Sequence, residues 1–443
     1  MVVEHIKKKE AILPIGLGII FSLIYYKLPL NYFSLALLGT MAIIIILYDI
    51  RIGIFAGAFI LPFMPDMLNM LYMIFLVGVY FYKGLFKKIN PLTKEAIDLP
   101  ILLFVIIITI STITSIDPSG SFRDLAIHIT SIGFLFVIVN NINSKRDFNI
   151  FIVFLVFSAT LVALYGFYQY KVGVEMEAKW VDTVNNPDVK TRIYSVFGNP
   201  NILAEYLIMI IPISISLFWF SKKAHKKMVF LITSLILMLA LILTLSRGGW
   251  LGFAFGIFVF ILLIEKRLLL SIIPVTLGAL YFLPQSILNR ILSIGNLADS
   301  SNSYRIRMWS ITWNIIKDHW LVGVGFGHLP FKATFETYIR TMPTYHAHNT
   351  YLETMAEMGI LGFIVFISFI FVLYKYSIKK LIKGKDRYIK TMTAGVLAGL
   401  SSVLVHGAVE NILYIPRIIM TFWILVALIL ALMRISDEYQ EIS

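Results

Sequence analysis

Cysteine is absent from this chain, and acidic residues are scarce: 25 Asp and Glu stand against 38 Lys and Arg in 443 residues. The absence of cysteine excludes disulfides, thiolate metal sites and a cysteine nucleophile. With few acids and no thiol, histidine is the side chain best suited to move a proton at neutral pH. The eight histidines are therefore the first places to look for chemistry.

Hydrophobic residues make up 59% of the chain and charged residues only 14%, which exceeds what a soluble core needs. The composition predicts an all-α, polytopic transmembrane helical bundle. At about 20 residues per span the chain has room for roughly 12 to 14 helices and for no separate soluble domain. We therefore expect residues 1–443 to form a single integral-membrane domain. Apolar runs that could span lie near 11–27, 33–50, 52–65, 68–86, 99–116, 124–142, 148–171, 199–220, 228–246, 248–264, 268–284, 349–374, 391–409 and 412–434.

The formal net charge of +13 comes largely from lysines in short connections between apolar runs, a distribution that argues against nucleic acid as a partner. Alternate connections carry these charges, among them Lys7–Lys9, Lys222–Lys227 and the block Lys375–Lys390. The positive-inside rule predicts that these connections and both termini face the cytoplasm, with membrane lipids around the bundle.

Two connections on the opposite, outer face are long: 172–198, the first outer loop, and 285–348, the large outer loop. Long polar loops in a compact membrane protein are usually functional or disordered. The large loop is expected to hold an amphipathic helix over about 303–319 that lies against the membrane, because apolar residues recur there at helical spacing. These residues are Ile306, Trp309, Trp313 and Ile316.

Arginines, rather than lysines, lie at the predicted outer boundary of the membrane. Guanidinium binds phosphate through a planar fork and stays charged, so these arginines suit a diphosphate. The alternative is that they reach toward lipid headgroups. The diphosphate interpretation is strongest for Arg247, because Gly248 and Gly249 beside it allow close approach of a ligand. The candidate diphosphate-binding residues are Arg192, Arg247, Arg305 and Arg307.

Asn199 and Asn201 open the next outer-face helix and could bind sugar hydroxyls. The alternative is that Asn199 is only an N-cap, with Pro200 at the first helical position. The glycine-rich stretch Gly323–Gly327 lacks both the preceding strand of a dinucleotide fold and the Gly-Lys-Ser/Thr of a phosphate loop, which argues against a nucleotide site.

His346 and His348 lie where the large outer loop meets the helix that follows. They could ligate a metal with His328 or Glu353, cap the helix, or supply a general base. No cluster of carboxylates accompanies them in the sequence, so no metal and no cofactor are predicted. The neighbouring arginines favour His348 as the base.

Six ordered motifs between residues 192 and 362 resemble those of the O-antigen ligase and O-antigen polymerase superfamily, and the likeness extends over about residues 100–430. The motifs are Arg192 with Ser195–Asn201, Ser246–Trp250, Arg305–Trp309, Gly323–Gly327, His346–Leu352 and Glu357–Gly362.

The resemblance implies a GT-C-type glycosyltransferase that is metal-independent and inverting, and that acts at the outer face of the cytoplasmic (inner) membrane. Its donor would be a polyprenyl-diphosphate-linked glycan and its acceptor a glycan or a lipid, lipid A-core among them. The family's catalytic histidine corresponds to His348, and its diphosphate-binding arginines to Arg247 and Arg305; Arg307 lies outside that match. Asn199, Asn201, His346 and Asn349 are expected to support the substrate.

The predicted function is transfer of the glycan to an acceptor other than the donor's own repeat. The alternatives are a polymerase that extends lipid-linked repeats and, in another class, a transporter of lipid-linked sugars. Against transport, the polar groups concentrate on one face, whereas a flippase needs polar lining through to the cytoplasmic side.

Overall fold

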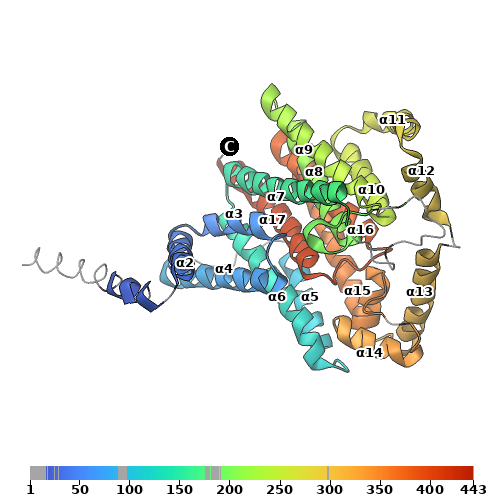
Figure 1. The fold of residues 1–443 in the computed structure, drawn as a ribbon, viewed down its shortest axis with the longest axis horizontal. Coiled ribbons are helices and arrows are strands. Elements are labelled where there is room, and N and C mark those ends of the chain that lie inside the picture. The colour runs from blue at the N-terminus through green and yellow to red at the C-terminus, as the bar shows by residue number, and fades with distance from the viewer. Residues whose placement is uncertain are drawn as a thin grey trace, which may run out of the picture. The chain divides into compact units, whose positions relative to one another are not determined.

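A computed structural model describes residues 29–87, 97–174, 191–296, 299–342 and 344–442, with a few further positions among 16–27 and at 180 and 189. The described residues are mainly helical and contain no β-strand, as Figure 1 shows. The chain divides into two compact units, Met1–Gly53 and Ile54–Ser443. The candidate site lies within the second unit.

The first unit holds α2 (Leu30–Tyr48), and α3 (Ile50–Ile60) begins in it. The helices of the second unit are α4 (Asp66–Lys87), α5 (Asp98–Ile113), α6 (Pro118–Asn141), α7 (Lys145–Val172), α8 (Pro200–Phe220), α9 (Ala224–Leu243), α10 (Arg247–Ile264), α11 (Leu269–Phe282), α12 (Gln285–Leu292), α13 (Ser300–Asp318), α14 (His328–Tyr338), α15 (Thr350–Tyr376), α16 (Arg387–His406) and α17 (Pro416–Ile442).

Ten helices of the described residues are long and apolar enough to cross a membrane: α2, α4, α6, α7, α8, α9, α10, α15, α16 and α17. This confirms a polytopic helical bundle. Of the fourteen expected runs, three form helices of 11, 16 and 14 residues, α3, α5 and α11, which are shorter than the about 20 residues that a span needs. In the run at 11–27, residues 11–15, 17 and 24 lie outside the described residues, and in the loop at 172–198, residues 175–179, 181–188 and 190 do.

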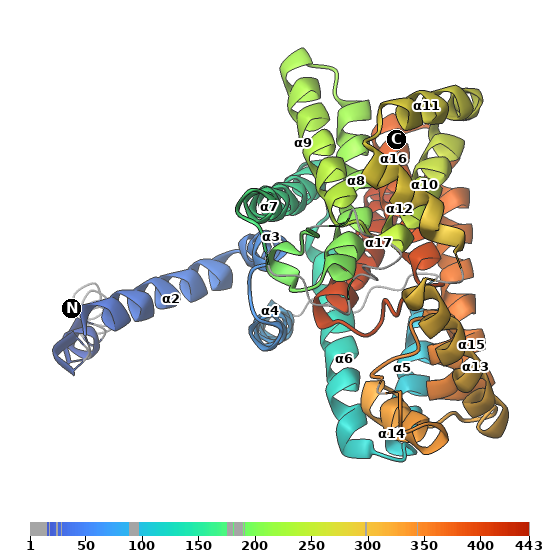
Figure 2. The ribbon, with the colours of Figure 1, turned by 45° about the vertical axis from the view of Figure 1, so that its right-hand side comes forward.

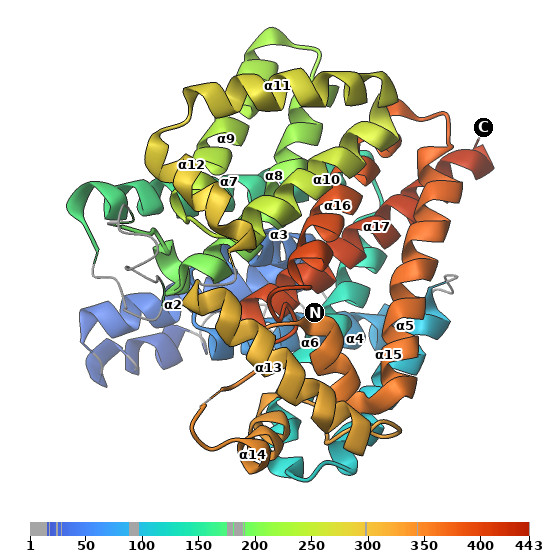
Figure 3. The same cartoon turned by 90° about the vertical axis from the view of Figure 1, so that its right-hand side faces the viewer.

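Helices α8, α16 and α17 are the most enclosed elements of the second unit, as Figures 2 and 3 show. Small residues let their neighbours approach closely. A Cβ at Gly399 of α16 would lie 2.3 Å from the carbonyl oxygen of Met209 in α8. A Cβ at Gly256 of α10 would lie 2.7 Å from the carbonyl oxygen of Ala398. These glycines therefore let α8, α10 and α16 pack closely against one another.

Helix α15 is broken at Gly359, whose φ of +66° and ψ of −171° are not helical. The segment 320–325 fills the break: Ile360 donates its N–H to the oxygen of Trp320 at 2.8 Å, and Val324 donates to Ala356 at 2.9 Å. Segment 320–325 thus supplies hydrogen-bond partners for backbone groups that the break leaves without a partner inside the helix. Residues 350–358 form a separate short helix that begins directly after His348 and Asn349.

Helix α13 occupies the place expected for an amphipathic helix, and of the four apolar residues that predicted it only Ile316 is buried within the protein. Ile306 and Trp313 are exposed, and Trp309 is half-buried. Thr312 is also buried, and its hydroxyl donates to the carbonyl oxygen of Met308 at 2.8 Å. The buried residues of α13 are Met308, Thr312, Ile315 and Ile316, which face α14 and α15.

Candidate active site

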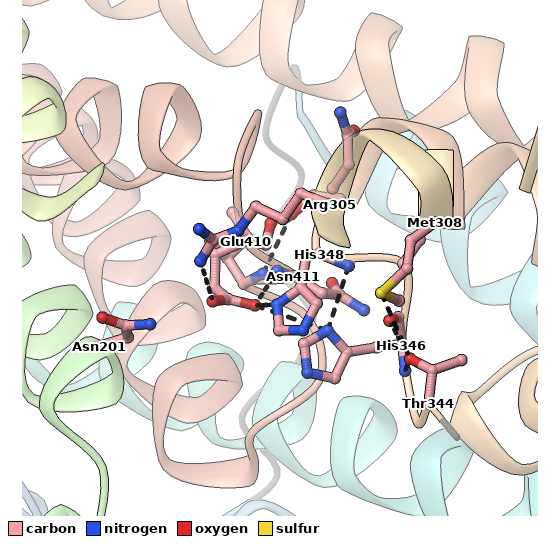
Figure 4. Close-up of polar contacts among 12 residues, drawn as sticks. Asn201, Arg305, Met308, Thr344, His346, His348, Glu410 and Asn411 are labelled. Atoms are coloured by element: carbon pink, nitrogen blue, oxygen red, sulfur yellow. Dashed lines mark hydrogen bonds and ion pairs between the residues drawn. The ribbon is translucent and has the colours of Figure 1, made fainter. Parts of the chain in front are cut away.

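His348 and Glu410 form the centre of the site, with Arg305 on the other side of the carboxylate, as Figure 4 shows. The His348 Nδ1 lies 2.5 Å from Oε1 of Glu410. The other carboxylate oxygen lies 3.6 Å from Nη2 of Arg305. An ionised carboxylate only accepts hydrogen bonds, so the Nδ1 of His348 must carry the proton. The Nε2 of His348 is then the atom that can accept another proton.

Glu410 lies in the turn between α16 and α17 and is 6% exposed. Burial by itself would raise its pKa, but the interaction with His348, by charge and by hydrogen bond, and the charge of Arg305 outweigh burial and hold the pKa well below the ordinary 4.5. Glu410 is therefore ionised at neutral pH and gives His348 a fixed negative partner.

The two segments that carry this pair are tied together by their backbones. Thr350 donates its N–H to the carbonyl oxygen of Gly407 at 2.8 Å and to that of Glu410 at 3.1 Å. Asn349 caps α15, because its side chain accepts from the N–H groups of Tyr351 and Leu352. His348 itself has a φ of +48°, a conformation that non-glycine residues adopt only where the surroundings enforce it. The imidazole is thus held by a strained backbone.

His346 lies beside His348, with 4.1 Å between the ring centroids. Burial and the nearby charge of His348 lower the pKa of His346 to about 3, so the ring is neutral at physiological pH. Its Nδ1 is 3.3 Å from the backbone N of His348 and accepts that N–H. The neutral ring then carries its proton on Nε2 and can donate a hydrogen bond. It is too weakly basic to serve as the general base.

Arg247 begins α10 and lies in a buried ion pair with Asp299, at distances of 3.1 and 3.0 Å from its two carboxylate oxygens. Arg247 is 8% exposed and Asp299 only 1%. The same guanidinium donates to the carbonyl oxygen of Ser293 at 2.8 Å. Helix α10 thus presents both its N-terminus and a guanidinium to the connection between α12 and α13.

Arg192 is also buried, and its guanidinium donates to Asn201 at 2.9 Å and to the carbonyl oxygen of Thr244 at 2.8 Å. Burial, followed by repulsion from Arg290, Arg247 and Arg305, lowers the pKa of Arg192 to about 9. Arg192 therefore stays protonated at neutral pH.

Arg290 on α12 belongs to the same group, because burial and the charge of Arg247 lower its pKa to about 10. Four guanidinium groups, those of Arg192, Arg247, Arg290 and Arg305, thus repel one another within one region. Among the described residues, Asp299 pairs with Arg247 and Glu410 pairs with Arg305, so these two carboxylates do not balance the charge of the four guanidinium groups. Such a region attracts an anion.

The other predicted site residues take different places. Asn199 is the N-cap of α8 and accepts the N–H of Asn201 at 2.8 Å, as the alternative interpretation proposed. Asn201 reaches the cluster through Arg192. Arg307 is exposed on α13, and among the described residues it forms no ion pair. Sequence reasoning missed Glu410, Asp299 and Arg290.

A metal site remains an alternative for the centre, because ligand atoms of His346, His348 and Glu410 lie within 4.8 Å of one another. Two imidazoles and a carboxylate are a common zinc set. The further ligands considered from the sequence are engaged elsewhere: His328 pairs with Asp124 at 2.7 Å, and Glu353 accepts the N–H of Ala347 at 2.5 Å. Metal independence stays a prediction.

Replacing Glu410 with glutamine should lower activity by about 10²- to 10⁴-fold, because His348 would lose both its fixed orientation and the counter-charge of its protonated form. The variant should also change the acid stability. A carboxyl whose folded-state pKa is depressed stabilises the fold above pH 4.5, and this contribution is lost as pH falls through the lower folded-state pKa. Thermal unfolding of the detergent-solubilised protein should thus depend less on pH below 4.5 in Glu410→Gln than in the wild type.

Residues 231–367 match the family model described as "O-Antigen ligase". The chain is also similar to the teichuronic acid biosynthesis protein TuaE of Bacillus subtilis (strain 168), with 24% identity over 342 residues that cover 72% of this chain and 67% of that protein. Arg247, Arg305 and His348 fall inside the family match, whereas Arg192 and Glu410 fall outside it.

Proposed function

We propose that this chain transfers a glycan from a polyprenyl diphosphate to an acceptor hydroxyl. The two matches support its membership of the O-antigen ligase and polymerase superfamily. The observation that carries the proposal is the His348–Glu410 pair beside a cluster of arginines with surplus positive charge. A sugar hydroxyl needs a base, and a departing diphosphate needs stabilisation of its charge. The site offers both.

In the proposed reaction, Nε2 of His348 removes the proton of the acceptor hydroxyl while its oxygen attacks the anomeric carbon. The bond from that carbon to the diphosphate oxygen breaks, and its electron pair leaves with the lipid diphosphate. Arg305 and Arg247 would stabilise the growing negative charge. Glu410 would stabilise the imidazolium. Attack opposite the leaving group inverts the anomeric configuration.

An apolar groove of 390 Å³ between α10, α15 and α16 offers a place for the donor's prenyl chain. Tyr351, at the site end of the groove, lies three residues after His348 and donates its hydroxyl to the carbonyl oxygen of Leu404 at 2.6 Å. The groove would keep the lipid in the membrane while the diphosphate reaches the arginines. Its lining residues are Phe255, Tyr351, Ile367, Ile370, Phe371, Tyr374, Ser401, Leu404 and Val405.

The charges at the two ends of the bundle support an active site on the outer face. Helices α8, α10, α15 and α17 begin near the arginines and His348, and α16 ends there. At the opposite end of α16, Lys145 pairs with Asp386, and Lys380 pairs with Asp437 near the end of α17. By the positive-inside rule the lysine-rich end faces the cytoplasm, as would both termini.

Polymerisation is the second candidate, in which the acceptor is another lipid-linked repeat. The similarity to a protein of teichuronic acid biosynthesis favours a polysaccharide product but does not separate the two reactions. Product length does: a ligase adds a preassembled glycan once, whereas a polymerase produces a ladder of repeats.

The test is transfer by the purified protein in liposomes that contain a lipid-linked oligosaccharide and candidate acceptors, with and without EDTA. We expect product with EDTA present and an inverted anomeric linkage by NMR. Loss of activity with EDTA, restored by zinc, would favour the metal alternative. Movement of the donor across the bilayer without any glycosyl transfer would instead identify a transporter.

A further inference from the structure

A second acid and histidine pair, Glu205 and His406, lies in the helices behind the site. The two residues are only 1% and 3% exposed, and His406 Nε2 lies 3.3 Å from Oε1 of Glu205. Among the described residues, Oε2 of Glu205 and both ring nitrogens of His406 have no hydrogen-bond partner, so Glu205 and His406 meet as an ion-pair contact. Ionisable groups inside a membrane protein are costly and usually serve a function. The reaction proposed above gives this pair no role.

The pair joins the helices that carry the two halves of the site. Glu205 lies one turn beyond Asn201 on the same face of α8, and Asn201 accepts a hydrogen bond from Arg192. His406 ends α16, and its carbonyl oxygen accepts the N–H of Val409 at 2.9 Å, in the turn that leads to Glu410. The contact between Glu205 and His406 therefore connects α8, whose Asn201 binds Arg192, to the turn that carries Glu410.

The first turn of helix α10 also packs against His406. A Cβ at Gly248 would lie 2.8 Å from Nδ1 of His406 and 2.8 Å from a methyl carbon of Val409. Gly248 directly follows Arg247, so only a residue without a side chain lets the first turn of α10 pack this closely. His406 is thus enclosed by the segments that position Arg247 and Glu410.

The net charge of the pair also bears on the base. Glu205 interacts electrostatically with Glu410 and His348 as well as with His406. An imidazole and a carboxyl group in contact that share one proton have no net charge. Glu410 then keeps its place as the negative partner in contact with His348. Without His406, Glu205 would be a lone buried acid close to that carboxylate, which is unfavourable.

We propose that Glu205 and His406 are positioning residues for glycosyl transfer. They hold the first turn of α10 against the turn that carries Glu410. This contact fixes the position of Arg247 relative to the His348–Glu410 pair. The inference rests on the function proposed above. Small displacements of reacting groups have large effects on rate, because the bound geometry must place the reacting atoms in contact.

The test compares His406→Gln, Glu205→Gln, the double variant and Gly248→Ala in the liposome assay, with kcat and KM for the lipid-linked donor. His406→Gln and Gly248→Ala should lower kcat by about 10²-fold with little change in KM. The double variant should recover about tenfold over His406→Gln, because two glutamines can hydrogen-bond without a lone acid. Gly78→Ala, whose added Cβ has no neighbour within 4 Å, is the matched control.

Wild-type kcat in both His406→Gln and Gly248→Ala would overturn the positioning role. So would a loss that only follows the amount of folded protein, measured by size-exclusion recovery and thermal unfolding, with no rescue in the double variant. If the wild type itself transfers no glycan, the proposed function fails first. If the wild type is active and the variants have the same kcat, the positioning role is rejected and the proposed function stands.

Discussion

Replacing His348 with glutamine should reduce the rate of glycosyl transfer by roughly 10²- to 10⁴-fold, the usual contribution of a general base. Glutamine can still donate to Glu410, so the carboxylate keeps a hydrogen-bond partner, but it cannot take up the acceptor's proton. The KM for the lipid-linked donor should change little, because the proposed diphosphate site is formed by arginines. Initial rates in the liposome assay, measured over a range of donor concentrations, check both expectations.

His346→Gln is the matched control, since this ring lies 4.1 Å from that of His348 in the same segment. A neutral hydrogen-bond donor is replaced by another, so the loss should be much smaller than in His348→Gln. Equal losses in the two variants, together with bound zinc in the purified wild type, would contradict the general-base role and point to a metal site. Full activity in His348→Gln would reject the assignment outright.

The sequence alone located the residues whose motifs are local. His348, Arg247 and Arg305 each lie at or near a helix start or on a helix with a recognisable pattern, and the structure places them around one region. Glu410 could not be found in this way. It is 62 residues from His348 along the chain, and only the tertiary contact between the turn after α16 and the start of α15 reveals the pair. A scarce acid between apolar runs was the one available signal.

The same limit applies to the fold. Apolar runs predicted the long helices well, because the membrane requires about 20 apolar residues per span. They did not reveal the break at Gly359, since an apolar run continues through it and the compensating hydrogen bonds come from segment 320–325. They also did not indicate which residues of α13 pack inside the protein, because the buried Thr312 is polar and satisfies its hydroxyl within the helix. Pairwise contacts between distant segments decide such details.

The Arg247–Asp299 ion pair predicts that stability and catalysis can be separated by mutation. Arg247→Gln removes one partner of a buried ion pair and takes the Arg247 guanidinium away from Asp299, which is 1% exposed. Breaking such a pair costs about 3–5 kcal/mol. The variant also loses the group proposed to stabilise the leaving diphosphate, a loss expected to cost about 10²–10³ in rate. Thermal unfolding and kcat should therefore both fall.

The double variant Arg247→Gln, Asp299→Asn distinguishes the two effects. With asparagine at position 299, most of the lost stability should return, because two neutral amides can hydrogen-bond in place of the ion pair. The rate should stay low, because the guanidinium is still missing. Arg307→Gln, which changes an exposed arginine of α13, should leave both quantities near the wild type. Recovery of rate along with stability in the double variant would show that Arg247 serves only to hold the connection before α13, and would remove it from the diphosphate site.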